Sequence, residues 1–243
     1  MIKVEPLLAD AVRHFWTTRA SQEEKQGTRT GTKDAGSRAA VTGGKHADGF
    51  INLLAAIVKD AGLLDVEIHT TEKASLTLPG FFRPTKVWDL VIICRGDLVG
   101  AVEVKSQVGS FGNNFNNRVE EAVGNATDFW TAYREGAFRP SQRPWLGYLF
   151  MLEEDPVSLR PRRRVALPHF AVDEAFQEQS YLKCYEEVCL RLLRERLYDA
   201  CCYFSSSAQT GRNGEYREPN SELGIRKFAA ALHGKASAIA HLT

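Results

Sequence analysis

Val87-Trp88-Asp89-Leu90-Val91-Ile92-Ile93 is followed, after the turn Cys94-Arg95-Gly96-Asp97, by a second apolar stretch, Leu98-Val99-Gly100-Ala101-Val102-Glu103-Val104-Lys105. Two apolar runs joined by a short turn with glycine are typical of a β-hairpin. We therefore predict a hairpin centred on Gly96. In that register Asp89 lies opposite Glu103, because both residues are seven positions from Gly96.

This hairpin would place two carboxylates against each other. Side chains directly opposed in antiparallel strands have Cβ atoms about 4.5–5.5 Å apart, and like charges there are destabilising. A divalent cation removes the conflict, and Mg²⁺ usually takes one or two protein carboxylates together with water and substrate phosphate. We therefore expect Asp89, Glu103 and the backbone carbonyl of Val104 to hold Mg²⁺.

Lys105 completes this candidate centre. It lies two residues beyond Glu103 and so projects from the same face of the strand. There it would hold and polarise an attacking water and stabilise the charge that builds on a phosphate. The alternative is a pair of ordinary edge carboxylates near a lysine, because the D-x(n)-E-x-K spacing alone is a weak signal.

Periodicity outside the hairpin predicts the remaining elements. Helices are expected at 5–24, 47–61, 115–134 and 173–197, with a last helix through Leu223, Phe228 and Leu232, and strands at 145–152 and 200–204. Strands that alternate with helices predict an α/β or α+β fold in which helices flank a mixed central sheet. We expect a single domain over residues 1–243, with a flexible arm or loop near 26–46.

The composition limits the class of protein. Of 243 residues, 44% are hydrophobic, and 31 basic side chains face 30 acidic ones, which gives a net charge of +1. That balance does not suit a protein that coats nucleic acid, but it allows local basic patches. No signal peptide or membrane-spanning apolar run is evident, and the five cysteines show no usual zinc spacing. These features predict a cytoplasmic protein with reduced, mostly buried thiols and no membrane partner.

Two longer motifs carry a resemblance to known enzymes. The segment from Pro84 to Asp89, followed by Glu103-Val104-Lys105, resembles the active-site motif of the PD-(D/E)XK nuclease superfamily, although Trp88 stands where proline often precedes the aspartate. The continuation from Lys105 to Ala122, and the stretch from Asp128 to Gly136, are similar to the XhoI family of type II restriction endonucleases.

The resemblance implies a fold and a specific activity. The expected fold is restriction-endonuclease-like, and the expected enzyme is a homodimer that cuts double-stranded DNA with Mg²⁺. The implied target is the palindrome 5′-CTCGAG-3′, cut after the first C on each strand to leave four-base 5′ overhangs. A DNA methyltransferase of the same specificity would be its functional partner.

Two polar segments are candidates for DNA contact. The first is a predicted loop from Gln107 to Arg118, which leaves the catalytic strand. Amide side chains can pair with adenine, and arginine can pair with guanine. Its candidate residues are Gln107, Asn113, Asn114, Asn116, Asn117 and Arg118. The alternative is that asparagine and glycine here only form turns and a helix cap.

The second segment is a basic cluster that runs from Arg160 to Arg164. We expect its arginines to contact phosphate or guanine, and a solvated loop is the alternative. The arginines proposed for DNA contact are Arg162, Arg163 and Arg164. Asp48 is the candidate for a third active-site acid, although an acidic residue at a helix N-terminus is also favoured by the helix dipole. Glu120 and Glu121 are further acidic candidates.

Other functions remain open at this level. A structure-specific or repair nuclease of the same fold would cut DNA without sequence preference, which the asparagine-rich segment argues against. A non-catalytic DNA-binding regulator would lack a metal ligand or the lysine, and all three positions are intact here. A protein unrelated to nucleic acids is compatible with the neutral charge and with little else.

Overall fold

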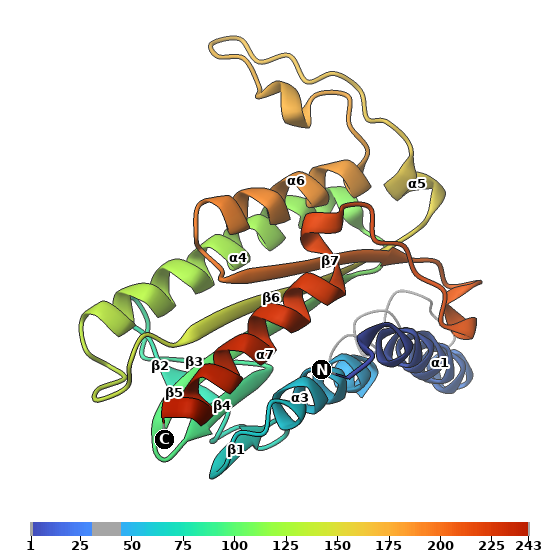
Figure 1. The fold of residues 1–243 in the computed structure, drawn as a ribbon. Coiled ribbons are helices and arrows are strands. Elements are labelled where there is room, and N and C mark those ends of the chain that lie inside the picture. Colours follow the sequence, from blue (N-terminus) through green and yellow to red (C-terminus); the bar gives the residue numbers. More distant parts are fainter. Residues whose placement is uncertain (1, 31–44, 243) are drawn as a thin grey trace.

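Five strands form a mixed sheet between two layers of helices in this computed structural model, which describes residues 2–30 and 45–242 (Figure 1). The order across the sheet is β1-β4-β5-β6-β7, with antiparallel pairs from β1 to β5 and parallel pairs from β5 to β7. The strands are β1 (Val66–His69), β4 (Leu90–Cys94), β5 (Asp97–Gln107), β6 (Trp145–Glu153) and β7 (Ala200–Ser206). The predicted mixed central sheet is confirmed.

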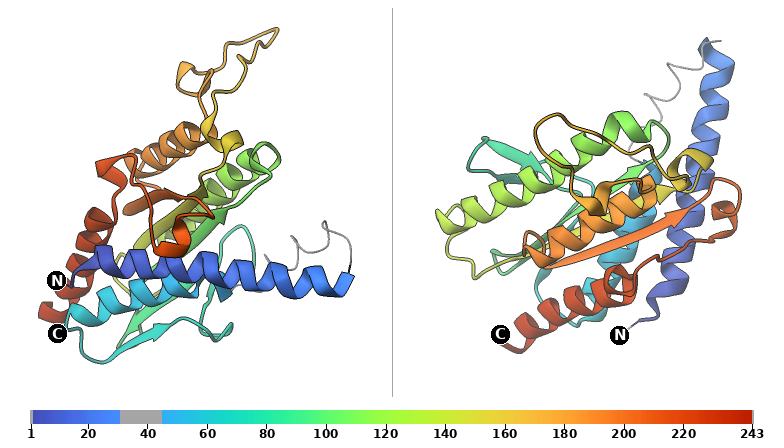
Figure 2. Two further views of the ribbon diagram at one scale, coloured as in Figure 1. Left: turned by 90° about the vertical axis from the view of Figure 1, so that its right-hand side faces the viewer. Right: turned by 90° about the horizontal axis from the view of Figure 1, so that it is seen from above.

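Helices cover both faces of this sheet (Figures 1 and 2). One face carries α1 (Val4–Thr30), α3 (Asp48–Asp60) and α7 (Ile225–Leu242), and the other carries α4 (Phe111–Arg134) and α6 (Tyr181–Arg194). Short elements complete the fold: α5 (Pro156–Leu159) and 3-10 turns at Lys45–Ala47, Glu174–Phe176, Gly211–Asn213 and Ser221–Leu223.

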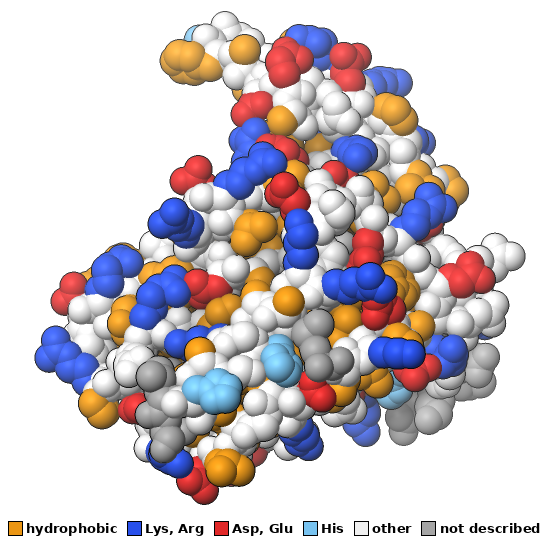
Figure 3. Space-filling model, in the orientation of Figure 1, with side chains coloured by type: hydrophobic (Ala, Val, Ile, Leu, Met, Phe, Trp, Pro, Cys, Tyr) orange, Lys and Arg blue, Asp and Glu red, His pale blue; other side chains and the backbone are white. Residues whose placement is uncertain are grey.

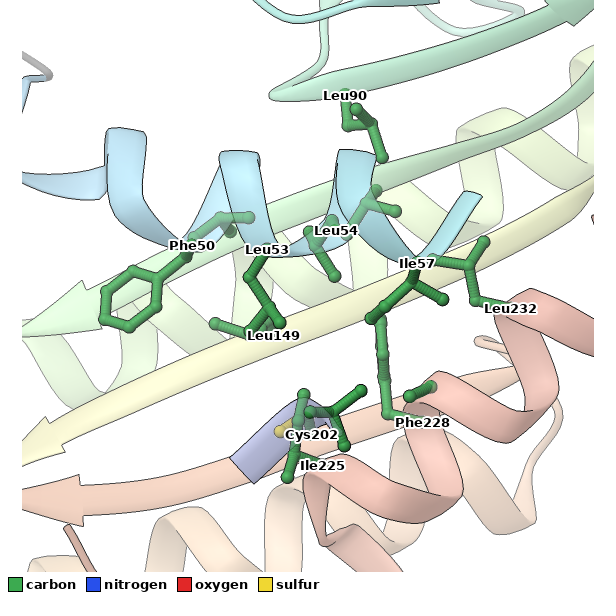
Figure 4. Close-up of a cluster of buried hydrophobic side chains, with 14 of the residues drawn as sticks. Phe50, Leu53, Leu54, Ile57, Leu90, Leu149, Cys202, Ile225, Phe228 and Leu232 are labelled. Atoms are coloured by element: carbon green, nitrogen blue, oxygen red, sulfur yellow. The ribbon is translucent and has the colours of Figure 1, made fainter. Parts of the chain in front are cut away.

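Successive side chains of β5 point to opposite faces of the sheet. Val102 and Val104 belong to the core beneath α1, α3 and α7, part of which Figure 4 shows. Ala101 belongs to the opposite core, beneath α4 and α6. Because side chains alternate along a strand, Glu103 and Lys105 share the face of Ala101 and lie beneath α4.

Near Leu90 the two strands of the hairpin pair in the predicted register, but the turn and the pairing next to it differ from the prediction. Leu90 pairs with Val102, which is the register expected for Asp89 opposite Glu103, although the ladder itself ends at Leu90. The turn consists of Arg95 and Gly96 alone, both with positive φ, which suits the twist of a two-residue hairpin. An irregularity between Ile92 and Ile93 then shifts the register by one residue. The prediction of a turn centred on Gly96 was therefore wrong. The one-residue shift between Ile92 and Ile93 is a β-bulge, and it restores the predicted pairing further along the strands.

The first predicted strand, residues 87–93, is divided between two sheets. A small second sheet pairs β2 (Thr77–Pro79) with β3 (Thr85–Val87). The N–H of Trp88 still bonds to Leu76 O at 2.9 Å, whereas the N–H of Asp89 bonds to Val102 O at 3.2 Å in the central sheet. The chain thus passes from the small sheet to the large one between Trp88 and Asp89.

Several helix boundaries differ from the predictions. The first helix continues to Thr30 rather than ending near 24. Of the arm or loop predicted near 26–46, residues 31–44 lie outside the described residues, and Lys45 and His46 belong to a 3-10 turn. The helix predicted from 173 begins at Tyr181, where the Ser180 side chain accepts a hydrogen bond from the N–H of Lys183. The segment before it, residues 160–180, extends away from the sheet (Figure 1).

All five cysteines are free and buried, which confirms the prediction of buried thiols. Within the described part of the chain, no helix combines the length and the apolar character needed to cross a bilayer.

Candidate active site

Asp89 is held by the backbone of the strand opposite. Its Oδ2 accepts a 2.8 Å hydrogen bond from the N–H of Val104. Burial, and secondly the neighbouring Glu103 carboxylate, raise the pKa of Asp89 above its ordinary value. The two carboxylates therefore repel each other in this site, as the hairpin register predicted.

The Glu103 carboxylate is more deeply buried than that of Asp89, and it pairs with the ammonium groups of two lysines. Its side chain is 1% exposed, with Lys105 Nζ 2.5 Å from Oε1 and Lys86 Nζ 2.7 Å from Oε2. The Nδ2 of Asn125, from α4, donates a longer hydrogen bond of 3.4 Å to Oε1. Burial opposes ionisation, but the ion pairs with Lys105 and Lys86 outweigh it and leave the pKa of Glu103 below its usual value.

Lys105 is a stable cation in this site. Burial opposes its charge, but Glu103 and then Asp89 outweigh the burial and raise the pKa of Lys105. It is therefore protonated at neutral pH, so it can stabilise negative charge and orient a water. A base for deprotonating that water has to come from another group.

Sequence reasoning missed Lys86 and Asn125. Lys86 lies on β3, whose pairing with β2 was not predicted, and three-residue strands carry too little periodicity to reveal it. Asn125 was counted only as part of a helix. Its Oδ1 accepts from Arg83 at 2.9 Å, so it links Glu103 to the loop between β2 and β3.

That loop is fixed to α4 by a second buried carboxylate. Asp128 Oδ1 accepts from the backbone N–H groups of Phe81 and Phe82 at 2.9 and 2.7 Å. Its Oδ2 accepts from Arg83 Nε at 2.9 Å. Burial acts against the charge, but these three donors hold the pKa of Asp128 below its ordinary value. The small sheet that carries Lys86 is therefore anchored beside the site.

The residues present fit a divalent metal. Apart from its ion pair with Lys86, the buried Oε2 of Glu103 accepts no hydrogen bond from the described residues. The N–H of Val104 points to Asp89, and the N–H and C=O of one strand residue face the same neighbour, so the Val104 carbonyl is directed to that side too. Across residues 2–30 and 45–242, no three His, Cys, Asp or Glu side chains group into a metal site. Two carboxylates and a carbonyl, completed by water and phosphate, suit Mg²⁺.

The asparagine-rich segment is helical, not a loop. α4 begins at Phe111, so the asparagines lie on its first two turns. The exposed ones are Asn113, Asn116 and Asn117. Asn114 donates from Nδ2 to Ser110 O at 3.0 Å and so stabilises the helix start.

The two flanking residues of this segment are also engaged within the protein. Gln107 is buried at the end of β5, and its Nε2 donates to Gly109 O. Arg118 is paired with Glu121 at 2.7 Å. The exposed asparagines are therefore the side chains of this segment that are best placed to meet an external partner.

The arginine cluster divides into three environments. Arg162 donates to the backbone oxygens of Gln179 and Phe176, both at 3.0 Å, and lies over the Tyr181 ring. Arg164 pairs with Glu174 and Glu178. Arg163 is exposed, and no ion pair joins it to another described residue. Arg162 therefore supports the projecting segment from inside, while Arg163 faces solvent.

Asp48 is exposed on the first turn of α3, a helix that packs on the face of the sheet opposite to Glu103. The structure does not bring it into contact with the three catalytic candidates. Among the other acidic candidates, Glu121 is close enough to help raise the pKa of Lys105.

The surface carries both signs of charge. On the face shown in Figure 3, lysine and arginine side chains intermingle with acidic ones, in keeping with the net charge of +1. Hydrophobic side chains appear on the projecting segment at the top of that view. Val165, Leu167 and Phe170 of this segment are exposed.

Comparison with known proteins identifies the family. The model described as "Restriction endonuclease XhoI" matches residues 25–218. The type II restriction enzyme BstVI of Geobacillus stearothermophilus is 47% identical over 206 residues, which are 82% of this chain and 91% of that protein. AbrI of Azospirillum brasilense is 51% identical over 162 residues, 66% of this chain and 71% of AbrI.

XhoI of Xanthomonas vasicola is 44% identical over 183 residues, 75% of this chain and 72% of that enzyme. No solved structure matches the chain. The mixed sheet flanked by helices agrees with a restriction-endonuclease-like fold. The chain belongs to the XhoI family of restriction endonucleases.

Proposed function

We propose that this chain is a type II restriction endonuclease that hydrolyses both strands of double-stranded DNA at CTCGAG, with Mg²⁺ as cofactor. The observation that carries the proposal is the joint placement of Asp89, Glu103 and Lys105 in a chain of this family. The target and the cut after the first C rest on family membership, as do the 5′ overhangs.

In the proposed mechanism, Asp89, Glu103 and the Val104 carbonyl would hold Mg²⁺, and the bound ion would supply Lewis-acid stabilisation of the phosphate and lower the pKa of a bound water. Lys105 stays protonated beside Glu103 and directs its ammonium group towards the attacking water and the phosphate oxygen. The Val104 N–H keeps Asp89 in place, and Asn125 supports Glu103 from α4. These contacts orient the centre before DNA arrives, so little reorganisation is needed during reaction.

DNA recognition is assigned to the start of α4 and to the arginine segment. Asn113, Asn116 and Asn117 present exposed amides on the helix that follows the catalytic strand, so we assign them contacts near the cut. Arg163 is assigned to the phosphate backbone. Asp48 has no role in this proposal, because α3 packs on the opposite face of the sheet, and Asp48→Ala should therefore cleave normally.

The enzyme would act as a homodimer in the bacterial cytoplasm. A palindromic target mirrors a two-fold protein, with one active site for each strand. A methyltransferase of the same specificity would protect the host's own copies of the site.

The test is a digest of plasmid DNA that contains one CTCGAG site. The proposal predicts a single linear product in Mg²⁺, none in EDTA, and none from a matched plasmid whose site is scrambled. Sequencing the ends should show the cut after the first C. Discrete fragments with other ends would replace the target, and random degradation would favour a structure-specific nuclease.

A further inference from the structure

Lys86 reaches the catalytic glutamate from the small second sheet. It lies on β3, opposite Leu78, and its side chain is only 12% exposed. The ammonium group lies 2.7 Å from Glu103 Oε2 and 4.6 Å from the centre of the Trp88 ring. Nζ also donates to Val87 O at 3.1 Å. The lysine is therefore directed inward at the active site.

The two lysines balance the charge of the centre without a metal. When Asp89 and Glu103 are both ionised, their two negative charges are matched by the two positive charges of Lys86 and Lys105. Burying a carboxylate is unfavourable unless it is paired. Lys86 thus helps to keep the almost fully buried Glu103 ionised in the metal-free protein.

The same contact places Lys86 where a metal would bind. A cation coordinated by Glu103 Oε2 would meet the ammonium group within a few ångströms, and two cations so close in a buried site repel strongly. Lys105 does not block this oxygen, because it contacts Oε1, to which Asn125 also donates. Oε2 has the Lys86 ion pair and no hydrogen bond from the described residues.

We propose that the Lys86 ammonium group occupies the metal position at Glu103 Oε2 in the metal-free enzyme and is displaced when a divalent cation binds. This inference rests on the proposed metal centre and deepens it. It makes Lys86 a competitor of the metal, so that metal affinity in the absence of DNA is held down by this one ammonium group.

The test measures Ca²⁺ binding without DNA by isothermal titration calorimetry. Lys86→Met keeps most of the side-chain volume and removes the charge, so it should bind Ca²⁺ about tenfold more tightly than the wild type, or better. Lys86→Arg retains the charge and should bind at the wild-type level. Lys73→Met, which removes an exposed lysine just before β2, is the matched control and should also behave as wild type.

Thermal unfolding provides a second readout. In EDTA, Lys86→Met should melt below the wild type because Glu103 loses a counterion. Added Ca²⁺ should then raise its melting temperature by more than it raises that of the wild type. If Lys86→Met does not fold, Lys86→Gln takes its place in both measurements.

Binding by Glu103→Gln distinguishes a failure of the Lys86 proposal from a failure of the proposed metal centre. If a folded Lys86→Met or Lys86→Gln variant binds Ca²⁺ no more tightly than the wild type does, while Glu103→Gln abolishes binding, Lys86 does not compete with the metal. If Glu103→Gln leaves Ca²⁺ binding unchanged, or if the Lys86→Met variant and the wild type both fail to bind Ca²⁺, the metal centre itself is wrong, and the Lys86 proposal falls with it.

Discussion

The N–H of Val104 donates to Asp89 Oδ2 at 2.8 Å, so the strand that carries Glu103 also holds the carboxylate opposite it. The Asp89 side chain is therefore fixed to the backbone of the strand that carries Glu103. The mutual repulsion of the two carboxylates is built into the metal-free protein, and it has a measurable effect on stability.

Asp89→Asn should raise the melting temperature of the metal-free protein at neutral pH. Burial and then Glu103 raise the pKa of Asp89 above its ordinary 3.8. An acid whose pKa is raised by folding destabilises the folded state once pH exceeds the folded value, and this penalty is absent below the unfolded value. Asparagine retains an oxygen that can accept from Val104.

The gain in stability should therefore shrink as pH falls towards about 4, the pKa of the unfolded acid, and should be absent below it. Thermal unfolding in EDTA, from acid to neutral pH, measures it. If Asp89→Asn is less stable than the wild type at neutral pH, the ionised Asp89 carboxylate stabilises the folded protein, and the predicted repulsion from Glu103 does not dominate.

The adjacent arginines Arg162 and Arg163 should behave differently. Arg162→Ala should lower the free energy of unfolding by about 1–3 kcal/mol, because the partly buried backbone oxygens of Phe176 and Gln179 lose the guanidinium donor. Arg163→Ala should leave stability unchanged but weaken DNA binding equally on cognate and scrambled duplexes, with a flatter salt dependence. Denaturant unfolding and a salt series of binding curves measure the two effects. Loss of cognate binding alone would make Arg163 a base reader.

The exposed asparagines of α4 should contribute specificity. Asn116→Ala or Asn117→Ala should weaken binding to CTCGAG by about 1–3 kcal/mol and leave binding to a scrambled duplex nearly unchanged. Asn114→Ala is the internal comparison, because its amide is bonded to Ser110 O and should affect helix stability rather than base choice. Binding in Ca²⁺, which should allow association without cleavage, is the measurement. Equal losses on both duplexes would exclude these amides as base readers.

A dimer should be present at working concentration. Light scattering should give about twice the 27.1 kDa mass of the chain. A particle of one chain mass, both free and bound to DNA, would require each strand of the target to be cut in a separate encounter.

The sequence predicted that Asp89 and Glu103 lie close together, because two apolar runs and a glycine turn define the register of a hairpin. It did not reveal the shorter turn at Arg95-Gly96 or the bulge that restores the pairing. It missed Lys86 because the placement of β3 depends on contacts far along the chain, from Asp128 and Asn125 on α4.

The other misreadings have similar physical causes. Glycine and asparagine are poor helix formers, so the start of α4 resembled a loop. Packing overrides that propensity: Phe111 stacks on Tyr181, and Phe115 meets Tyr185 edge-on. Arg162 could not be distinguished from its neighbours, because its partners at Phe176 and Gln179 become close only in the folded chain.

Single-turnover cleavage of a CTCGAG duplex by Glu103→Gln and Lys105→Met tests the central claim most directly. Loss of a metal ligand or of the charge that stabilises the phosphate should reduce the rate by about 10²–10³ or more. Binding in Ca²⁺ and the circular dichroism spectrum should show that both variants are folded, and Glu67→Gln, an exposed acid on β1, should cleave normally. Near-normal cleavage by folded Glu103→Gln or Lys105→Met would contradict the assignment of this centre.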